Sequence, residues 1–243
     1  MKASCVGLFL AIVIHGASFD VASVKKSAEQ KGVDYRGRVI FSVDRISARN
    51  VTFHALIATA YHVQLSQVVG GKFKWLDSDE FDVDARAGGA TDPNGLREML
   101  QTLLRERFHL VVATEMKDLR ILALVVDAGG AKIKPSTGDP QPGRFHGTMQ
   151  QFADLLAVQT TIPGAVDPST PVMASSDPVP VVDKTGLTGE YDINVDLKPE
   201  LGTDRLTQWR RVLKDELGLR LESQRAKVAV LVVTGAERTP TAN

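Results

Sequence analysis

Acidic side chains gather between residues 77 and 84, and such a cluster could bind calcium. Its members are Asp77, Asp79, Glu80, Asp82 and Asp84. A helix–loop–helix calcium loop needs glycine at its sixth position and glutamate at its twelfth. Counted from Asp77, these positions hold Asp82 and Gly88, so the motif is not met. Because apolar residues alternate with the acids from Phe81 onward, we expect Asp82 and Asp84 on the solvent face of a strand. An adventitious surface cation site is the alternative.

A second candidate is Asp183, which follows an apolar run and precedes Lys-Thr-Gly and then Leu-Thr. A similar string in P-type ion pumps carries the aspartate that takes a phosphoryl group from ATP. That chemistry needs a nucleotide site, and no G-x-x-x-x-G-K-[ST] motif occurs. The pump string also has threonine after its glycine, where this chain has Leu187. We therefore expect a structural corner in which Gly186 and Gly189 turn the chain and Leu187 packs into the core.

The histidines show no spacing that suits a metal or a catalytic site. His54 and His62 lie two helical turns apart, about 12 Å along an axis, which is too far to share a metal. We expect His109 to point to solvent and His146 to lie in a linker. No G-x-S-x-G, H-E-x-x-H or G-x-G-x-x-G motif occurs. The sequence predicts no catalytic residue, metal ligand or cofactor, although a triad assembled from distant residues stays open.

Phe73 and Trp75 are the candidate partner-binding residues. They lie in GGKFKWLD (70–77), a predicted loop with two lysines beside a glycine pair. Exposed aromatic residues are frequent anchors of binding sites. The alternative is that Trp75 packs into the core of its own unit, as large aromatic residues usually do.

The first 18 residues predict a signal peptide. A positive start at Met1-Lys2 precedes the apolar run VGLFLAIVI (6–14), and Gly16 and Ser18 suit cleavage after Ser18. Nine apolar residues make a helix of about 14 Å, too short for a membrane core of about 30 Å. We therefore expect an exported, periplasmic or extracellular protein that does not span the membrane after cleavage. A buried first strand or helix is the alternative.

The charge and cysteine counts exclude several classes. The chain has 29 basic and 29 acidic side chains and no basic run longer than two residues, so we expect no nucleic-acid partner. The single cysteine, Cys5, lies in the predicted signal peptide. Disulfides and cysteine-ligated zinc are therefore not expected in the mature protein.

The elements that position these residues follow one order in two halves of the chain. The halves, 19–127 and 148–237, are joined by a Gly- and Pro-rich linker at 128–147. A Pro-rich stretch at 161–180 is interpreted as a surface insertion. Each half has a helix, a turn with a strand, a second helix and a terminal strand pair.

The matching positions can be named. Thr52 and Thr148 precede the first helices as caps, and the strands share glutamate, an aromatic residue and aspartate at 80–82 and 190–192. Asp92-Pro93 starts the second helix of the first half, whereas Thr203 or Asp204 starts that of the second half.

The terminal stretches, 108–126 and 217–235, have connections too tight for a parallel crossover, so we expect a hairpin in each. FDVASVK (19–25) and RVIFSV (38–43) add strands to the first unit. The sequence thus predicts an α+β fold produced by internal duplication. It consists of two related units, each a small, mostly antiparallel sheet with two helices packed on one face.

Several motifs in this order resemble the soil-associated protein family, an exported bacterial domain of unknown function. They are FDVASVK, ARNVTFHALIATAYHV, VVGGKFKWLDSDEFDVDA, LREMLQTLLRERFHL, LALVV and PVVDKTGLTGEYD. The resemblance covers nearly the whole mature chain and implies export, occasional fusion to antibiotic-sensor-type membrane metallopeptidases, and no established activity. Each half also resembles, more distantly, the short N-terminal domain of secretins and TonB-dependent receptors, a periplasmic module that docks other envelope proteins.

Together these observations predict a non-enzymatic binding or docking module of the cell envelope. Its expected partner is an envelope protein, a peptide or a cell-wall component. The alternatives are a secreted hydrolase with a site between the two units and a detached sensor domain. A free sheet edge or an exposed apolar patch would favour docking, and a Ser/His/Asp group in a cleft would favour the hydrolase.

Overall fold

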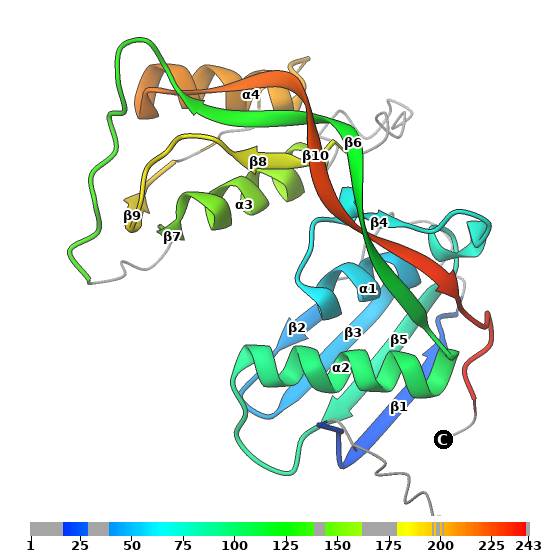
Figure 1. Ribbon diagram of the computed structural model, residues 1–243. Coiled ribbons are helices and arrows are strands. Elements are labelled where there is room, and N and C mark those ends of the chain that lie inside the picture. The colour runs from blue at the N-terminus through cyan, green and yellow to red at the C-terminus, as the bar shows by residue number, and fades with distance from the viewer. Residues whose placement is uncertain are drawn as a thin grey trace, which may run out of the picture. The chain divides into compact units, whose positions relative to one another are not determined.

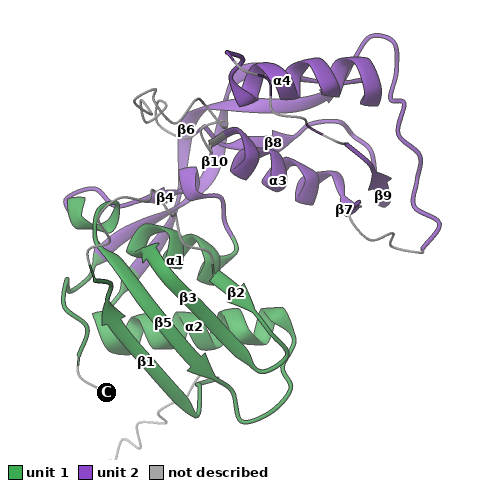
Figure 2. Ribbon diagram, turned by 180° about the vertical axis from the view of Figure 1, so that it is seen from behind, with its two compact units in different colours: residues 1–62, 74–111, 235–243 green, residues 63–73, 112–234 purple. Residues whose placement is uncertain are grey.

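The computed structural model describes residues 17–28, 39–138, 144–161, 179–195, 197, 200 and 202–241, and every structural statement concerns these residues. The chain forms two compact units (Figures 1 and 2). Unit 1 takes up residues 1–62, 74–111 and 235–243, and unit 2 takes up 63–73 and 112–234. Most of the predicted signal peptide and of the 161–180 insertion lies outside the described residues. None of the helices in the described ranges combines the length and apolar character that crossing a membrane requires.

Unit 1 is an antiparallel sheet with both of its helices on one face (Figure 1). The strand order is β1-β5-β3-β2. The strands are β1 (Val21–Lys26), β2 (Val39–Phe41), β3 (Arg45–Thr52) and β5 (Glu80–Arg86). The helices are α1 (Phe53–Tyr61) and α2 (Pro93–Phe108), and a short 3-10 turn, η2 (Lys74–Leu76), precedes β5.

Local capping explains where the unit 1 helices begin. The Thr52 hydroxyl accepts a hydrogen bond from the Ala55 N–H at 3.2 Å. The Asp92 carboxylate accepts from the N–H groups of Asn94 and Gly95 at 2.7 and 3.0 Å, and Pro93 opens α2. These caps satisfy N–H groups that have no partner within the helix, which confirms the two predicted helix starts.

The core of unit 1 centres on three fully buried phenylalanines, Phe53, Phe81 and Phe108. They come from α1, β5 and α2, and their ring centroids lie 4.3 to 5.8 Å apart. Tilted and edge-on contacts at these distances add to the burial of apolar area. The core therefore ties both helices to the middle of the sheet.

Unit 2 has a sheet of order β4-β10-β6-β8 and a separate strand pair, β7-β9. The strands are β4 (Val68–Val69), β6 (Val111–Val126), β7 (Phe145–Thr148), β8 (Val181–Asp183), β9 (Glu190–Ile193) and β10 (Leu219–Gly235). β4 and β8 run parallel to their neighbours, and β7 and β9 are antiparallel. The helices are α3 (Met149–Thr161) and α4 (Arg205–Val212), which continues as a π-helical turn, η3 (Leu213–Leu217). Before β4, the 3-10 turn η1 spans Leu65–Gln67.

The helices of unit 2 also begin at caps that the sequence predicts. The N–H of Gln151 donates to the Thr148 hydroxyl at 3.3 Å, and the Gln151 side chain accepts from the Thr148 N–H at 2.8 Å. At α4, the Asp204 carboxylate accepts from the Thr207 N–H at 2.9 Å. Between the helices lies a core that includes Phe152, Leu156 and Trp209.

The predicted hairpins at 108–126 and 217–235 are wrong. Each stretch is one continuous strand, and β6 and β10 pair with each other. Neither contains the Asn-Gly or Asp-Gly type of dipeptide that a two-residue hairpin favours. Polar residues near the middle of each strand, such as Glu115 and Gln224, are exposed and do not form turns.

The two compact units alternate along the chain. The sequence predicts successive units at 19–127 and 148–237 instead. The chain passes between the units at four points, after residues 62, 73, 111 and 234. β7 lies at the end of the segment expected as a linker. The predicted α+β class is confirmed, because both units combine helices with sheets.

The matching halves do agree in one strand register. In the β3-α1-β5 segment, the capping Thr52 is the antiparallel partner of Glu80. In the β7-α3-β9 segment, the capping Thr148 is the antiparallel partner of Glu190. The two segments therefore correspond at the helix cap and at the facing strand residue, and the internal duplication itself stays a prediction.

Candidate functional site

The two candidate aromatic residues belong to different units. Trp75 in η2 is half-buried, and its ring lies 5.0 Å from that of Phe53 with a 34° tilt. Phe73 belongs to unit 2, where the Lys72 ammonium lies 5.1 Å from its ring centroid. Trp75 therefore packs against the unit 1 core, and a binding role for either residue stays a prediction.

Asp183 ends β8 and makes a turn. Its Oδ1 accepts hydrogen bonds from the Thr185 N–H at 2.8 Å and from the Thr185 hydroxyl at 2.7 Å. The Thr185 hydroxyl in turn accepts from the Leu187 N–H at 3.1 Å, and Leu187 packs against the unit 2 core. Gly186 and Gly189 have φ of 70° and 90°, a region that favours glycine. The predicted structural corner is confirmed.

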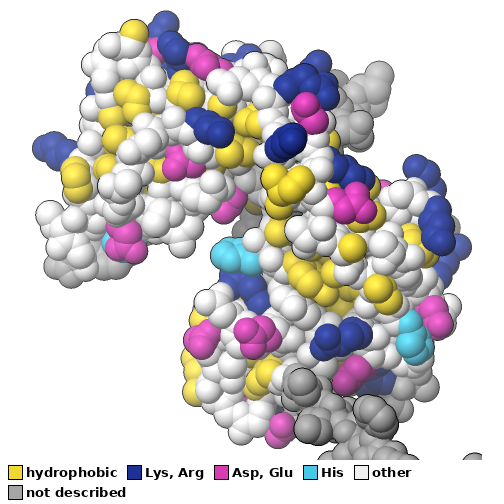
Figure 3. All heavy atoms as spheres, viewed as in Figure 1, with side chains coloured by type: hydrophobic (Ala, Val, Ile, Leu, Met, Phe, Trp, Pro, Cys, Tyr) yellow, Lys and Arg dark blue, Asp and Glu magenta, His cyan; other side chains and the backbone are white. Residues whose placement is uncertain are grey.

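Asp82 and Asp84 lie on the open face of the unit 1 sheet, as predicted, because the residues that alternate with them, Phe81, Val83 and Ala85, are fully buried on the other face. Arg45 donates through Nε to Asp84 Oδ1 at 2.9 Å, and this contact lowers the pKa of the Asp84 carboxyl. Among the described residues, no group of three or more His, Cys, Asp or Glu side chains could hold a metal. On the face drawn in Figure 3, basic and acidic side chains are intermixed over both units.

The most buried carboxylate of unit 1 is Asp79, which is 5% exposed. Arg238 binds it through two hydrogen bonds, Nε–Oδ2 at 2.7 Å and Nη2–Oδ1 at 2.9 Å, and the Lys26 ammonium lies 3.2 Å from Oδ2. The Arg238 hydrogen bond, helped by Lys26, lowers the pKa of Asp79 to about 2. These contacts tie β1 and the C-terminal segment to the turn before β5.

His146 is the centre of a polar cluster in unit 2. Its Nδ1 lies 2.8 Å from Asp192 Oδ1 and 3.3 Å from the Ser136 hydroxyl, and its Nε2 lies 3.4 Å from Glu190 Oε2. Hydrogen bonding to Asp192, helped by Glu190, raises the pKa of His146, and the same contact lowers the pKa of Asp192. His146 thus lies in a strand and not in a linker.

The cluster contains the three residue types of a hydrolytic triad but not its geometry. In a triad, the nucleophile and the carboxylate bind opposite nitrogens of the imidazole. Here Ser136 lies on Nδ1, the nitrogen that the triad carboxylate occupies, and shares it with the hydrogen-bonded carboxylate Asp192. The opposite nitrogen, Nε2, faces Glu190 at 3.4 Å and not a nucleophile. The Ser136 hydroxyl also accepts from the Gly138 N–H at 3.1 Å. We conclude that this group orders the β7-β9 strand pair.

Sequence reasoning missed this cluster although a signal was available. Once Thr148 is set opposite Glu190 by analogy with Thr52 and Glu80, antiparallel register places His146 opposite Asp192. Ser136 could not be found in this way, because it reaches β9 through an irregular segment.

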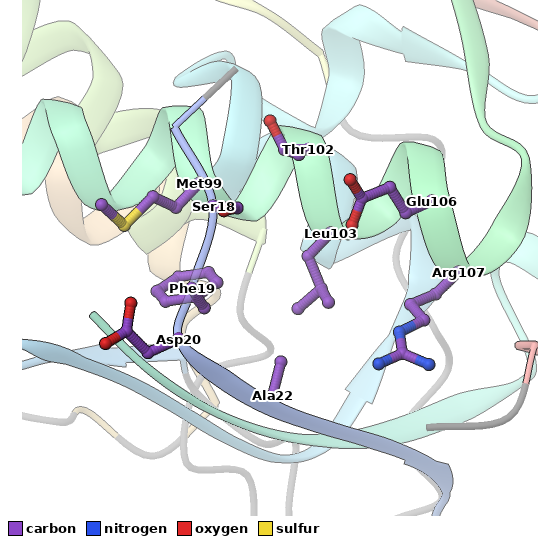
Figure 4. Close-up of a pocket in the computed structure, with 9 residues that line it drawn as sticks. All are labelled: Ser18, Phe19, Asp20, Ala22, Met99, Thr102, Leu103, Glu106 and Arg107. Carbon is purple, nitrogen blue, oxygen red and sulfur yellow. The ribbon is translucent and has the colours of Figure 1, made fainter. Parts of the chain in front are cut away.

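A cavity of about 120 Å³ lies in unit 1 between the start of β1 and α2 (Figure 4). One wall is formed by Ser18, Phe19, Asp20 and Ala22. The other is formed by Met99, Thr102, Leu103, Glu106 and Arg107 of α2. The cavity therefore adjoins the predicted cleavage site after Ser18.

Comparison with known families matches residues 54–236 to the family described as a protein of unknown function, DUF3738. The chain belongs to this family. No curated protein and no solved structure matches it. The DUF3738 match includes Trp75, His146 and Asp183, whereas β1, the Ser18–Ala22 wall of the cavity and Arg238 lie outside the matched residues. The association with soil bacteria and the likeness to secretin and TonB-dependent receptor domains stay predictions.

Proposed function

We propose that this protein is an exported, non-enzymatic docking module of the cell envelope. It binds an extended segment of an envelope protein along the outer edge of β1. The observation that carries the proposal is the position of β1, which is the outermost strand of the unit 1 sheet. No described strand pairs with its other side.

The register indicates which backbone groups of β1 are available. The Ser27 N–H donates to the Glu80 carbonyl at 2.9 Å, which continues the ladder of β1 and β5. Because hydrogen-bonded positions alternate in an antiparallel pair, Val21, Ser23 and Lys25 face β5. The N–H and C=O groups of Ala22 and Val24 then point outward from the sheet. An unpaired row of this kind is a template for an added strand.

The chemistry of the edge favours a peptide over a glycan partner. An added strand matches alternating donors and acceptors at the spacing of a second polypeptide backbone. A cell-wall glycan has no such ladder. An extended peptide segment is therefore the partner class that this edge fits.

Ala22→Pro tests the docking edge, and Ala22→Ser is its matched control. Proline removes an outward N–H while sparing the ladder with β5, and edge strands tolerate it at such positions. A photo-reactive residue at the exposed Ser23 should yield an adduct with an envelope protein in cells. The adduct should persist with Ala22→Ser and fall at least roughly tenfold with Ala22→Pro, as the loss of a backbone contact of about 1.4 kcal/mol predicts. Equal yields in the two variants, at equal thermal stability, would rule out the edge.

Export is tested separately. Cell fractionation should place the protein outside the cytoplasm, and sequencing of the purified native protein should find Phe19 as its first residue. A cytoplasmic protein that retains Met1 would overturn the export part of the proposal. A secreted hydrolase with a site between the units and a detached sensor domain stay the alternative predictions.

A further inference from the structure

The cavity beside α2 has a wall made of the residues that flank the predicted cleavage site. Ser18 and Phe19 line it together with Thr102 and Glu106 (Figure 4). Cleavage after Ser18 would therefore create a new amino group within the lining of this cavity.

The backbone after that site is fixed to the sheet. The Asp20 N–H donates to the Arg86 carbonyl at 2.9 Å, one residue before β1 begins. The Asp20 carboxylate lies over Gly88, where a Cβ would come within 2.7 Å of Oδ2. Because the hydrogen bond to Arg86 fixes the backbone of Asp20, the Phe19 nitrogen stays close to its place beside α2.

Glu106 is the counter-charge available at this place. No described residue forms an ion pair or hydrogen bond with its carboxylate in the structure, and the residue is exposed. Asp20 points away from Glu106 and Arg107 (Figure 4). Arg107, the cation of the lining, has its guanidinium 3.4 Å from the Thr241 carbonyl, and Arg105 donates to Thr102 at 2.9 Å.

The helix itself favours a cation here. Glu106 lies in the last turn of α2, which ends at Phe108. The carbonyl end of a helix carries partial negative charge and stabilises nearby cations. An ammonium group between the start of β1 and this turn would meet both the helix end and a carboxylate.

We infer that the cavity beside α2 binds the amino terminus of the mature protein, where the α-ammonium of Phe19 forms an ion pair with Glu106. The inference rests on the export part of the proposed function. A signal peptidase adds water across the Ser18–Phe19 peptide bond, so that Ser18 leaves with a carboxylate and the Phe19 nitrogen takes up protons to become an ammonium. The precursor has an uncharged amide at this nitrogen and lacks the pair. Processing therefore adds a contact that holds the start of the edge strand.

The test uses the mature chain, released at Phe19 from a cleavable tag, so that it does not depend on processing in the cell. An acylating reagent at pH 7 modifies only the unprotonated amine, and mass spectrometry measures the rate at Phe19. Removal of the counter-charge with Glu106→Gln should speed the modification roughly threefold or more, because a neighbouring carboxylate favours the protonated form. Glu98→Gln, an exposed change on the same helix, should leave the rate unchanged.

A chain that starts at Ser18 provides a second check, since its amino group is displaced by one residue. Its rate should be insensitive to Glu106→Gln. All rates should agree in denaturant. Equal rates for the wild type and Glu106→Gln in the folded chain would overturn the inference. Retention of residues 1–18 in the native protein would instead overturn export. N-terminal sequencing of the native protein detects this result independently of the acylation rates.

Discussion

Single residues decide much of the stability of unit 1, and Asp79 is the clearest case. Its carboxylate is buried, whereas its partners Lys26 and Arg238 are about 60% exposed. Asp79→Asn would therefore leave two cations that water can solvate, which limits the loss to about 1–3 kcal/mol. Urea denaturation followed by tryptophan fluorescence measures this loss. Asp118→Asn, which removes a surface pair with Arg225, should change stability by less than about 0.5 kcal/mol.

The lowered pKa of Asp79 also predicts that part of the free energy of unfolding is lost in acid. The pKa of Asp79 is about 2 in the folded protein, below its ordinary 3.8. A carboxyl whose pKa is lowered on folding contributes to the free energy of unfolding above pH 3.8, and this contribution is lost as the pH falls through 2. For Asp79 it amounts to roughly 2 kcal/mol. The wild type should therefore lose its advantage over Asp79→Asn as pH falls from 4 to 2. A constant difference across that range would contradict the assigned pKa.

The raised pKa of His146 predicts the opposite pH dependence of stability in unit 2. Its pKa is raised above 6.5 in the folded protein by Asp192, with Glu190 adding to the effect. The stability that its ion pairs contribute is thus fully present below 6.5 and is lost as pH rises through the raised value. His146→Gln should remove this dependence between pH 6 and 9, whereas His62→Asn, at an exposed left-handed position, should keep it. NMR titration of the His146 ring gives the pKa directly, and an ordinary value would contradict the prediction.

At the scale of elements, local chemistry is predictable and long-range pairing is not. Thr52, Asp92 and Asp204 reveal helix starts because a cap needs partners only two or three residues away. The pairing of β6 with β10 joins strands about a hundred residues apart, and no local pattern encodes such a partner. Both strands contain apolar stretches separated by polar residues, and in a short window this pattern is also that of a hairpin.

The candidate site shows the same division. The Asp183 corner was predictable because an aspartate accepting from a residue two positions on is a local turn. The Asp79–Arg238 contact spans 159 residues, so nothing near Asp79 indicates it. The His146–Asp192 contact lies between these cases, since the duplicated Glu-aromatic-Asp pattern predicts its register.

At the scale of the whole molecule, the alternation of the two units predicts that the first half cannot fold as stably alone as within the chain. A fragment of residues 19–127 ends before β10 and before the segment that returns to unit 1. It lacks Arg238, the ion-pair partner of Asp79. It also lacks two backbone hydrogen bonds to the end of α2, from Glu237 to Phe108 at 2.7 Å and from Thr241 to Arg107 at 2.8 Å. Its β6 also loses β10 as a partner.

We expect this fragment to be less stable than the first transition of the whole chain by at least about 2 kcal/mol, as the loss of several hydrogen bonds and one part-buried ion pair implies. Thermal melts followed by circular dichroism measure the difference, and addition of a peptide of residues 219–241 should restore part of it. Arg238→Gln in the whole chain isolates the contribution of the ion pair. A fragment as stable as the whole chain, unchanged by the peptide, would show that the successive division at residue 127 describes the folding units better than the alternating one. Because the β1 edge and the α2 wall of the cavity both lie in unit 1, the same result would also show that docking and the pairing of the Phe19 amino group can be studied on that fragment alone.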